Sequence, residues 1–443
     1  MSSSEVGMAE RPTVVAPTDP EFVRWYPCDI SPEGAQHAWE PRELGVYVHV
    51  PFCSSICKCC AYNRIVARPD TIAAYVQAVR NEVQLYSERG VFANRRLVTV
   101  YFGGGTPTIL SPAQFDAILS SIASVCTAVA GCEISMEGNP ASVTKQHVRE
   151  LLNAGMNRLS VGVQSFNDTF LRLLGRQHDA NTALRAIDDA RDAGCESLGI
   201  DLMYNLPGQT LPQWERDVDR AIRLRVDHVS AYALELVPGT TLHREHGTTS
   251  DTTAVQRREL AVAGANRFLA SGYDQYAVYD FALPGKRCVY EFRHWAAPQM
   301  EWIGLGAGAF SFIDDLIYVN ILPPSRYICA VTRKRLPILA ASNLSAREHM
   351  ARYVVMGVKC LRVPCTPFEV RFGFRLESVF ADEIARLRRD GLAVLAHGEL
   401  VLTESGILDV DRVTMEFFTK ATRGLPQPCE DQMRLWIAPC ETG

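Results

Sequence analysis

Cys53-Ser54-Ser55-Ile56-Cys57-Lys58-Cys59-Cys60 is the segment that decides the fold, because it places four thiols within eight residues. It follows a strand-like stretch, Gly45-Val46-Tyr47-Val48-His49-Val50, and the turn-forming Pro51. Thiolates hold iron–sulfur clusters, and three of them separated by three and then two residues leave one iron of a four-iron cluster without a protein ligand. An iron with an open position can bind a substrate or a cofactor.

Three other interpretations of the cysteine segment are a zinc knuckle, a disulfide pair and chance clustering. A zinc knuckle requires two separated pairs of ligands, usually with histidine at finger spacing, and no second pair follows in this sequence. Among the four interpretations, the spacing favours an iron–sulfur cluster.

Composition narrows the class of protein. With 443 residues, the chain is long enough for one large barrel and one or two smaller domains. A net charge of -5 and a pI near 6.1 argue against broad electrostatic binding to nucleic acid. The sequence has 14 cysteines, no leader segment and no apolar run near the ~18 residues of a membrane span, which predicts a cytoplasmic protein without a membrane partner.

Short β-branched runs alternate with longer amphipathic ones from Gly45 to about Leu236, which is typical of βα units around a parallel sheet. Thr71–Ser87, for example, repeats apolar residues at helical spacing. Farther along, Tyr273–Tyr279 is predicted as a strand, and Leu392–Thr403 as a strand pair around a turn. The six strands predicted for the parallel sheet are 45–50, 97–102, 133–137, 157–163, 197–203 and 228–234. Chemistry in such sheets gathers at the carboxyl ends of the strands.

Cys53-x3-Cys57-x2-Cys60, framed by Tyr47-Val48-His49-Val50-Pro51-Phe52, resembles the cluster-binding signature of the HemN-like branch of the radical S-adenosylmethionine (SAM) superfamily. That branch includes oxygen-independent coproporphyrinogen III oxidase, a haem chaperone, and class C radical SAM methyltransferases and cyclopropanases. The resemblance covers nearly all of residues 45–420. It implies an α/β fold with a partial (β/α)6 barrel, an N-terminal arm and a C-terminal α+β winged-helix-like cap. It also implies a [4Fe–4S] cluster on Cys53, Cys57 and Cys60.

Two positions depart from the family pattern. The family usually has an aromatic residue just before the third cysteine, whereas this chain has Cys59, which is either a spare ligand or a small apolar side chain. We favour the apolar role. Coproporphyrinogen oxidase carries a fourth cysteine two residues after the third, where this chain has Tyr62. That difference weakens the assignment to porphyrin chemistry.

A glycine-rich loop, Gly103-Gly104-Gly105-Thr106, follows the second strand. Its glycines allow a backbone to approach a ligand closely and expose amides to a carboxylate, although an ordinary tight turn looks the same. Asp201 is notable in itself, because a buried acid in an apolar strand is costly unless it is paired. For Arg176 the alternative is an exposed surface ion pair. The resemblance implies SAM contacts from Tyr47, Gly104, Gly105, Thr106, Glu137, Gln164, Arg176 and Asp201.

Acid or base candidates lie beyond the sixth strand. Tyr232 and Glu235 reach the mouth of the predicted barrel, and His294 is either a base near neutral pH or a packed structural histidine. The run Ile303–Ser311 is rich in glycine and alanine but lacks the lysine and the βα context of a phosphate loop. By resemblance this run forms the wall of a second SAM pocket, with Phe310 against the nucleoside.

The predicted domains are an N-terminal arm (1–44, partly disordered), the barrel (45–245), a barrel extension with the second SAM pocket wall (246–344), and the cap with a tail (345–443). A winged helix often binds DNA. Here acidic residues offset the arginines of the cap, which favours a cap that covers the mouth of the barrel.

The function hypothesis that the resemblance favours is a class C enzyme using two SAM molecules. It would transfer a methyl or methylene unit to an unsaturated or heteroaromatic natural-product intermediate, by C-methylation or cyclopropanation in antibiotic biosynthesis. An electron donor such as flavodoxin or ferredoxin would reduce the cluster. The alternatives are a coproporphyrinogen III oxidase and a haem chaperone with little turnover, in which His294 or a cap histidine would be an axial ligand.

The cysteine assignment predicts different results for neighbouring thiols. After anaerobic reconstitution, Cys53→Ser, Cys57→Ser and Cys60→Ser should each lose most bound iron and sulfide, because each removes a cluster ligand. Cys59→Ser should retain both. Iron and sulfide analysis with visible absorbance measures this, and a Cys59→Ser protein without cluster would contradict the assignment.

Overall fold

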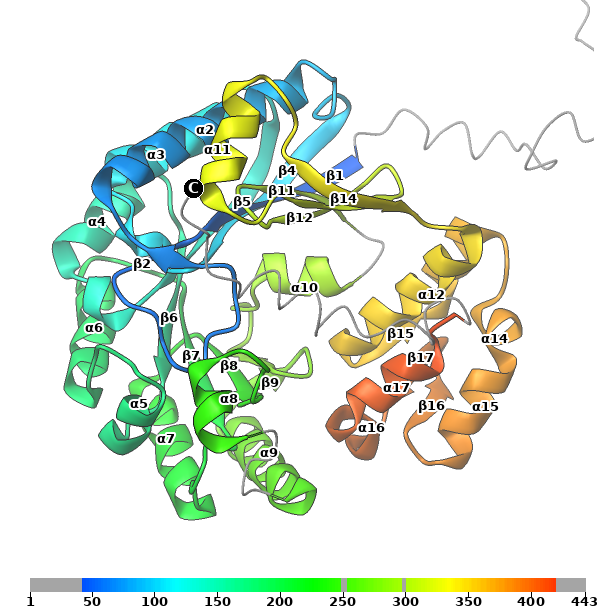
Figure 1. Cartoon of the computed structure of the whole chain (residues 1–443). Coiled ribbons are helices and arrows are strands. Elements are labelled where there is room, and N and C mark those ends of the chain that lie inside the picture. The colour runs from blue at the N-terminus through cyan, green and yellow to red at the C-terminus, as the bar shows by residue number, and fades with distance from the viewer. Residues whose placement is uncertain (1–41, 248–252, 297–299, 420–443) are drawn as a thin grey trace, which may run out of the picture. The chain divides into compact units, whose positions relative to one another are not determined.

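The computed structural model describes residues 42–247, 253–296 and 300–419, all within one compact unit, Arg42–Gly443. A twelve-stranded sheet dominates it, with helices along the outer face (Figure 1). Six consecutive parallel strands form its centre. They are β1 (Arg42–Val50), β4 (Arg95–Gly104), β5 (Thr127–Gly138), β6 (Arg158–Gln164), β7 (Leu198–Tyr204) and β8 (His228–Ala233). The predicted α/β fold and its six parallel strands are confirmed.

Further strands extend the sheet at both edges. β11 (Glu301–Leu305) pairs in parallel with β1, and three antiparallel strands follow it. These are β12 (Phe310–Ile313), β13 (Leu316–Asn320) and β14 (Ile338–Asn343). The other edge carries β10 (Asp280–Ala282) and β9 (Asp274–Gln275), antiparallel to β8 and to each other.

The prediction of one strand over Tyr273–Tyr279 is wrong. Only β9 is extended there, and the chain then turns back into β10. Tyr276 N donates to Asp280 O at 3.1 Å, and Asp280 N donates to Ala277 O at 3.3 Å. The β-branched and aromatic residues of this run therefore form part of a short hairpin and not one continuous strand.

Helices cover the outer face of the parallel strands (Figure 1). The larger ones are α2 (Pro69–Ser87), α3 (Pro112–Ala123), α4 (Lys145–Asn153), α6 (Ala180–Asp192) and α7 (Leu211–Leu224). Shorter elements in the connections are η1 (Pro107–Ile109), η2 (Pro140–Ser142), α5 (Asp168–Leu173) and α8 (Thr241–His246). Later helices are α9 (Ala254–Ala270), α10 (Val289–Trp295) and α11 (Pro324–Thr332). In the described part of the chain, no helix is long and apolar enough to cross a bilayer.

Side chains alternate between the two faces of the parallel strands. On β1, Val46, Val48 and Val50 belong to the core under the helices, whereas Tyr47 and His49 face the concave side and contact each other there. The same alternation places tyrosines, acids and serines of the other strands on the concave side. We call this space the lumen. Parallel strands with two covered faces are usually apolar throughout, so a polar lumen indicates a site.

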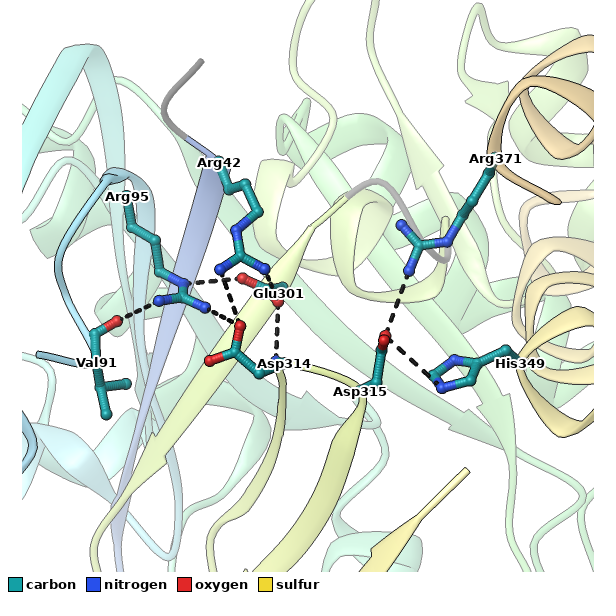
Figure 2. Close-up of polar contacts among 8 residues, drawn as sticks. All are labelled: Arg42, Val91, Arg95, Glu301, Asp314, Asp315, His349 and Arg371. Carbon is teal, nitrogen blue, oxygen red and sulfur yellow. Dashed lines mark hydrogen bonds and ion pairs between the residues drawn. The ribbon is translucent and has the colours of Figure 1, made fainter. Parts of the chain in front are cut away.

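Ion pairs hold the added strands to the centre of the sheet (Figure 2). The Arg95 side chain, only 3% exposed, lies 2.8 Å from Glu301 and 2.7 Å from Asp314. Arg42 reaches the same carboxylates at 3.0 and 2.8 Å. Because a buried guanidinium is costly unless it is paired, these two acids fix β11 and the β12–β13 turn beside β1 and β4.

The cap has its own hydrophobic core. Its strands are β15 (Arg362–Pro364), β16 (Ala393–Ala396) and β17 (Glu399–Leu402). Its helices are α12 (Ala346–Gly357), η3 (Val358–Cys360), α13 (Cys365–Phe372), α14 (Leu376–Val379), α15 (Ala381–Arg389), α16 (Glu404–Leu408) and α17 (Val410–Glu416). His397 and Gly398 turn between β16 and β17 with positive φ angles of 53° and 77°, which matches a tight hairpin. The predicted strand pair is confirmed.

The predicted domain boundaries stay predictions, with one observed difference. β1 begins at Arg42, so the last residues of the predicted arm belong to the sheet. The rest of the arm, and the tail from residue 420, lie outside the described residues. Between β2 (Phe52–Cys53) and β3 (Ile65–Val66), which pair in parallel, lies the cysteine segment.

A carboxylate of α2 is buried against the β11–β12 turn. Glu82 is fully buried and accepts hydrogen bonds from Gly306 N (2.8 Å), Tyr327 Oη (2.6 Å) and Asn320 Nδ2 (2.7 Å). Burial raises the pKa of Glu82 to about 7, and these three donors oppose that rise. Glu82 therefore anchors the glycine-rich turn to the helix layer.

Removing this acceptor should destabilise the protein. Glu82→Leu leaves the Gly306 amide and the Tyr327 hydroxyl without an acceptor, whereas Asn320 Nδ2 keeps Gly304 O and Gly306 O, so we expect a loss of about 3 kcal/mol in the free energy of unfolding. Glu82→Gln keeps an acceptor and should lose less. Urea unfolding measures both, with Glu88→Gln, an exposed acid just after α2, as a control. A Glu82→Leu protein as stable as the wild type would contradict this role.

Candidate functional site

The cysteine segment is locked to the end of β1 by the glycine loop. Gly105 N donates to Val50 O at 2.8 Å, and Thr106 N donates to Phe52 O at 2.8 Å. A Cβ on Gly105 would lie 2.7 Å from Phe52 O, so only glycine permits this approach. The Thr106 hydroxyl donates to Cys53 Sγ at 3.6 Å. The glycine loop and the first thiol therefore form one unit.

Arg176 connects a second thiol to the sheet. Its Nη1 lies 3.5 Å from Cys57 Sγ, and its Nη2 donates to Gly162 O at 2.6 Å. Lys58 N also donates to Leu174 O at 2.9 Å, so the loop before Arg176 packs on the cysteine segment. These contacts exclude the alternative of an exposed surface ion pair for Arg176, whereas its predicted contact with SAM stays a prediction.

The three predicted cluster ligands lie together at the mouth of the lumen. Cys53, Cys57 and Cys60 are half-buried and free of disulfides. Among the described residues, no three His, Cys, Asp or Glu side chains converge on a single metal ion. Three thiols with Thr106 and Arg176 as donors fit a multi-iron cluster, in which each thiolate holds a different iron.

Cys59 lies between two of these ligands in the sequence but has apolar neighbours. It packs against a small apolar cluster that includes Phe170, Leu174, Leu206 and Leu242. Burial raises the pKa of its thiol to about 12, so the thiol is protonated at neutral pH. These contacts agree with the interpretation of Cys59 as a small apolar side chain.

Glu137 bridges β4 and the glycine loop from the end of β5. Its carboxylate accepts hydrogen bonds from Tyr101 Oη (2.9 Å) and Gly104 N (3.0 Å). Burial and the charge of Asp201 raise its pKa to about 7. Any cation placed beside this carboxyl would stabilise the ionised form. The end of β5 is therefore suited to an ammonium or sulfonium group.

Asp201 lies on the lumen side of β7. Its carboxylate accepts a hydrogen bond from Ser160 Oγ at 3.1 Å, and burial raises its pKa. Glu291, on α10, has its pKa raised to about 8 by burial and by the charge of Asp280, with smaller effects from Glu137 and Asp201. The lumen is thus acidic, which suits a cationic ligand.

Gln164 ends β6 in a left-handed conformation, with φ of 68°. Its Oε1 accepts a hydrogen bond from Tyr232 Oη at 2.9 Å, which places the predicted Tyr232 in the lumen. Asp217 of α7 fixes the turn that follows. It accepts hydrogen bonds from Ser165 Oγ (2.5 Å) and Phe166 N (2.9 Å), and its side chain is buried. Sequence analysis missed Asp217, which appears there as one acid in an ordinary amphipathic helix.

Helix α10 lies on the lumen side, against β4 and β5. Its Tyr290 stacks on Tyr101 with ring centroids 4.5 Å apart, and Tyr47 stacks on both rings. Glu133 of β5 accepts hydrogen bonds from Val289 N (2.9 Å) and Tyr290 N (3.1 Å) at the start of the helix. Sequence analysis missed Glu133 and Tyr290. The polar residues Glu133, Ser135 and Glu137 alternate along the strand, and this pattern indicates that they share its lumen face.

Of the three acid or base candidates, Glu235 is placed differently from expectation, and His294 has the packed position that was one of its two interpretations. The Glu235 side chain is 65% exposed and lies 3.7 Å from Arg257 of α9, so it does not join Tyr232 in the lumen. The strand ends at Ala233, and the next residues turn away from the barrel axis. Burial lowers the pKa of His294 to about 3. A histidine that binds protons so weakly is a poor base at neutral pH.

Phe310 begins β12 and is 36% exposed. The turn before it is held by Asn63, whose Nδ2 donates to Ala307 O (3.0 Å) and Leu322 O (2.9 Å). Asn63 O in turn lies 2.8 Å from His49 Nε2. Asn63, three residues after Cys60, therefore connects the end of β1 through its backbone oxygen and the glycine-alanine run through its side chain.

Two parts of the chain match known protein families. Residues 47–221 match the Radical SAM superfamily, and residues 344–408 match the HemN C-terminal domain. Heme chaperone HemW of Bacillus subtilis is 29% identical over 367 residues, covering 82% of this chain and 96% of that protein. HemW of Mycobacterium tuberculosis is 30% identical over 372 residues, covering 81% and 93%. Bovine radical S-adenosyl methionine domain-containing protein 1, mitochondrial, is 30% identical over 402 residues, covering 86% and 88%.

A solved structure shares the architecture. Coproporphyrinogen III oxidase (HemN) from Escherichia coli superposes with a TM-score of 0.76 at 27% identity, covering 86% of this chain and 92% of that one. The comparison covers the barrel and the cap together.

These relatives overturn the class C hypothesis. The HemW proteins and E. coli HemN, each similar over most of this chain, are named as haem chaperones and as a coproporphyrinogen oxidase, and the bovine relative is named only for its radical SAM domain. Methylation, cyclopropanation and antibiotic biosynthesis are therefore wrong as predictions for this chain. The cysteine segment and the SAM motifs recur throughout the branch, so they do not specify what the radical acts on.

Asp217 should affect SAM binding through the Gln164 turn. Asp217→Ala leaves the Ser165 hydroxyl and the Phe166 amide without their acceptor, so we expect SAM affinity to fall about tenfold. Asp217→Asn keeps one acceptor and should lose less. Equilibrium dialysis with labelled SAM measures this, and Asp219→Asn on the same helix is the matched control. Equal affinity for wild type and Asp217→Ala would contradict a positioning role.

Proposed function

This chain belongs to the HemN-like family of radical SAM proteins, and from that premise we propose that it binds a tetrapyrrole as a haem-handling protein. The observation that carries the proposal is the similarity to HemW proteins over 93% to 96% of their length. Those proteins are named as haem chaperones. In this proposal haem is the cargo, whereas the cluster and SAM are the resident cofactors of the family.

The residues at the mouth of the lumen fit those cofactors. Cys53, Cys57 and Cys60 would hold the [4Fe–4S] cluster, with Thr106 and Arg176 as donors to the sulfur atoms. When bound, the reduced cluster cleaves SAM to give a carbon radical that abstracts hydrogen. The protein contributes orientation and exclusion of water.

SAM would lie between the glycine loop and the acidic lumen. We propose that Glu137, which lies beside the glycine loop, receives its ammonium group. Gln164 and Asp201 would bind the nucleoside. The raised pKa of Glu137 supports this arrangement, because a cationic ligand stabilises the carboxylate that burial disfavours. A second SAM beside Phe310 stays a prediction, as does a flavodoxin or ferredoxin as electron donor.

His294 is the proposed axial ligand of the haem iron. Neither of its ring nitrogens makes a hydrogen bond to any residue that the structure describes, and Nδ1 is buried without a partner. With its pKa lowered to about 3, the ring is neutral at pH 7. A neutral imidazole is the form that ligates iron.

Coproporphyrinogen III oxidation is the second candidate. The superposition with E. coli HemN favours it, whereas Tyr62 in place of the fourth cysteine of that enzyme weakens it. Both candidates share a tetrapyrrole ligand and differ in turnover.

Haem titration tests the proposal. The reconstituted protein should bind one equivalent of haem with a Soret band that saturates at that ratio. His294→Ala should shift the band and weaken binding about tenfold, because it removes the axial nitrogen. His246→Ala, an exposed histidine of α8, should leave both unchanged.

Two outcomes would contradict the proposal. One is the absence of stoichiometric haem binding. The other is conversion of coproporphyrinogen III with loss of carbon dioxide under reducing conditions with SAM, which would favour the oxidase. Mass spectrometry of the porphyrin products separates the two.

A further inference from the structure

Two cations of the cap lie over aromatic rings of the barrel extension. The guanidinium carbon of Arg352, on α12, is 3.8 Å from the centre of the Phe312 ring and 5.2 Å from that of Trp302. Lys359 Nζ, on η3, is 4.9 Å from the centre of the Trp295 ring. The two cations are seven residues apart, about two helical turns or ~10 Å along one helical face.

Neither cation has an anionic partner among residues 42–247, 253–296 and 300–419. The neighbouring basic groups of the cap do have one, since Asp315 lies 3.6 Å from His349 and 3.5 Å from Arg371 (Figure 2). Burial and the charge of Arg371 lower the pKa of Arg352 to about 10. A half-buried guanidinium that contacts only aromatic rings lacks the anion that would offset the cost of its burial.

The aromatic rings under the cations adjoin the proposed axial ligand. The His294 ring centroid lies 4.3 Å from that of Trp302 and 4.9 Å from that of Trp295. The charges of Arg352 and Lys359 both act on His294. The seam between α10, β11–β12 and the cap thus combines the buried rings of Trp302 and Phe312, the half-buried rings of His294 and Trp295, and two cations that make no ion pair with a described residue.

This combination matches one ligand chemistry. A flat aromatic macrocycle can pack against half-buried rings such as those of Trp295 and His294, and carboxylates on its edge would pair with a guanidinium and an ammonium. We propose that Arg352 and Lys359 bind the propionate carboxylates of a tetrapyrrole that packs at this seam. The inference rests on the proposed function and assigns the cap a direct part in holding the cargo.

The acidic lumen supports placing the carboxylates here. The buried acids Glu137 and Asp201 provide no cationic partner for a propionate inside the barrel. Arg352 and Lys359 of the cap would provide such partners.

The test compares haem with its dimethyl ester, in which both propionates are neutral. In the reconstituted protein, quenching of tryptophan fluorescence measures the affinity for each. Arg352→Gln and Lys359→Gln should each weaken haem binding about tenfold, and the double variant about a hundredfold. The affinity of the wild type for the ester should be about as low as that of the double variant for haem. The affinity for the ester should be the same in the wild type and in all variants.

The matched control is Arg388→Gln, an exposed cation on α15 with the same change in charge. Thermal melts verify that each variant is folded. Equal affinity of the wild type for haem and its ester, or a double variant that binds haem like the wild type, would overturn the propionate site. If the wild type binds neither haem nor its ester, the proposed function itself is contradicted. This outcome is measured on the wild type alone, before any variant is made.

Discussion

The structure depends on the pairing of polar groups inside a parallel sheet. Alternation sends valines and leucines to the helix layer and sends Tyr47, Tyr101, Glu137 and Asp201 into the lumen. Burying a carboxylate is costly unless hydrogen-bond donors surround it. Glu137 accepts hydrogen bonds from Tyr101 and the glycine loop, and Glu133 accepts them from the start of α10. These pairings position the loop that abuts the cysteine segment.

A second set of buried groups connects the site to the added strands. Glu82 and Asn63 hold the β11–β12 turn from two sides, one from a helix and one from the cysteine segment. Arg95 secures the other end of the same strands through Glu301 and Asp314. The barrel extension is therefore fixed to the cluster-binding end and to the far end of β1. The strands of the barrel extension that the cap contacts are therefore held in a defined position.

Family membership and function come from different parts of the molecule. The cysteine segment, the glycine loop and the cap establish a HemN-like radical SAM protein, and the barrel motifs recur in branches with different chemistry. The substrate depends on what surrounds the lumen. Here the buried acids Glu137, Asp201 and Glu291 lie in the barrel, and on the cap side Arg352 and Lys359 lie over aromatic rings without an ion pair to any described residue. This arrangement supports the proposal of a cationic cofactor inside and an anionic cargo at the cap.

The sequence by itself determined the features that local spacing encodes: the cysteine segment, the six parallel strands and the hairpin of the cap. Periodicity and turn chemistry act over a few residues, so they are visible without a fold. Tertiary structure alone decided the remainder. Asp217 reaches the Gln164 turn across 51 residues of sequence, and Glu133 meets α10 across 156. Glu235 pairs with Arg257 instead of entering the lumen. Such partners depend on strand register and on the paths of connecting loops, which residue spacing does not specify.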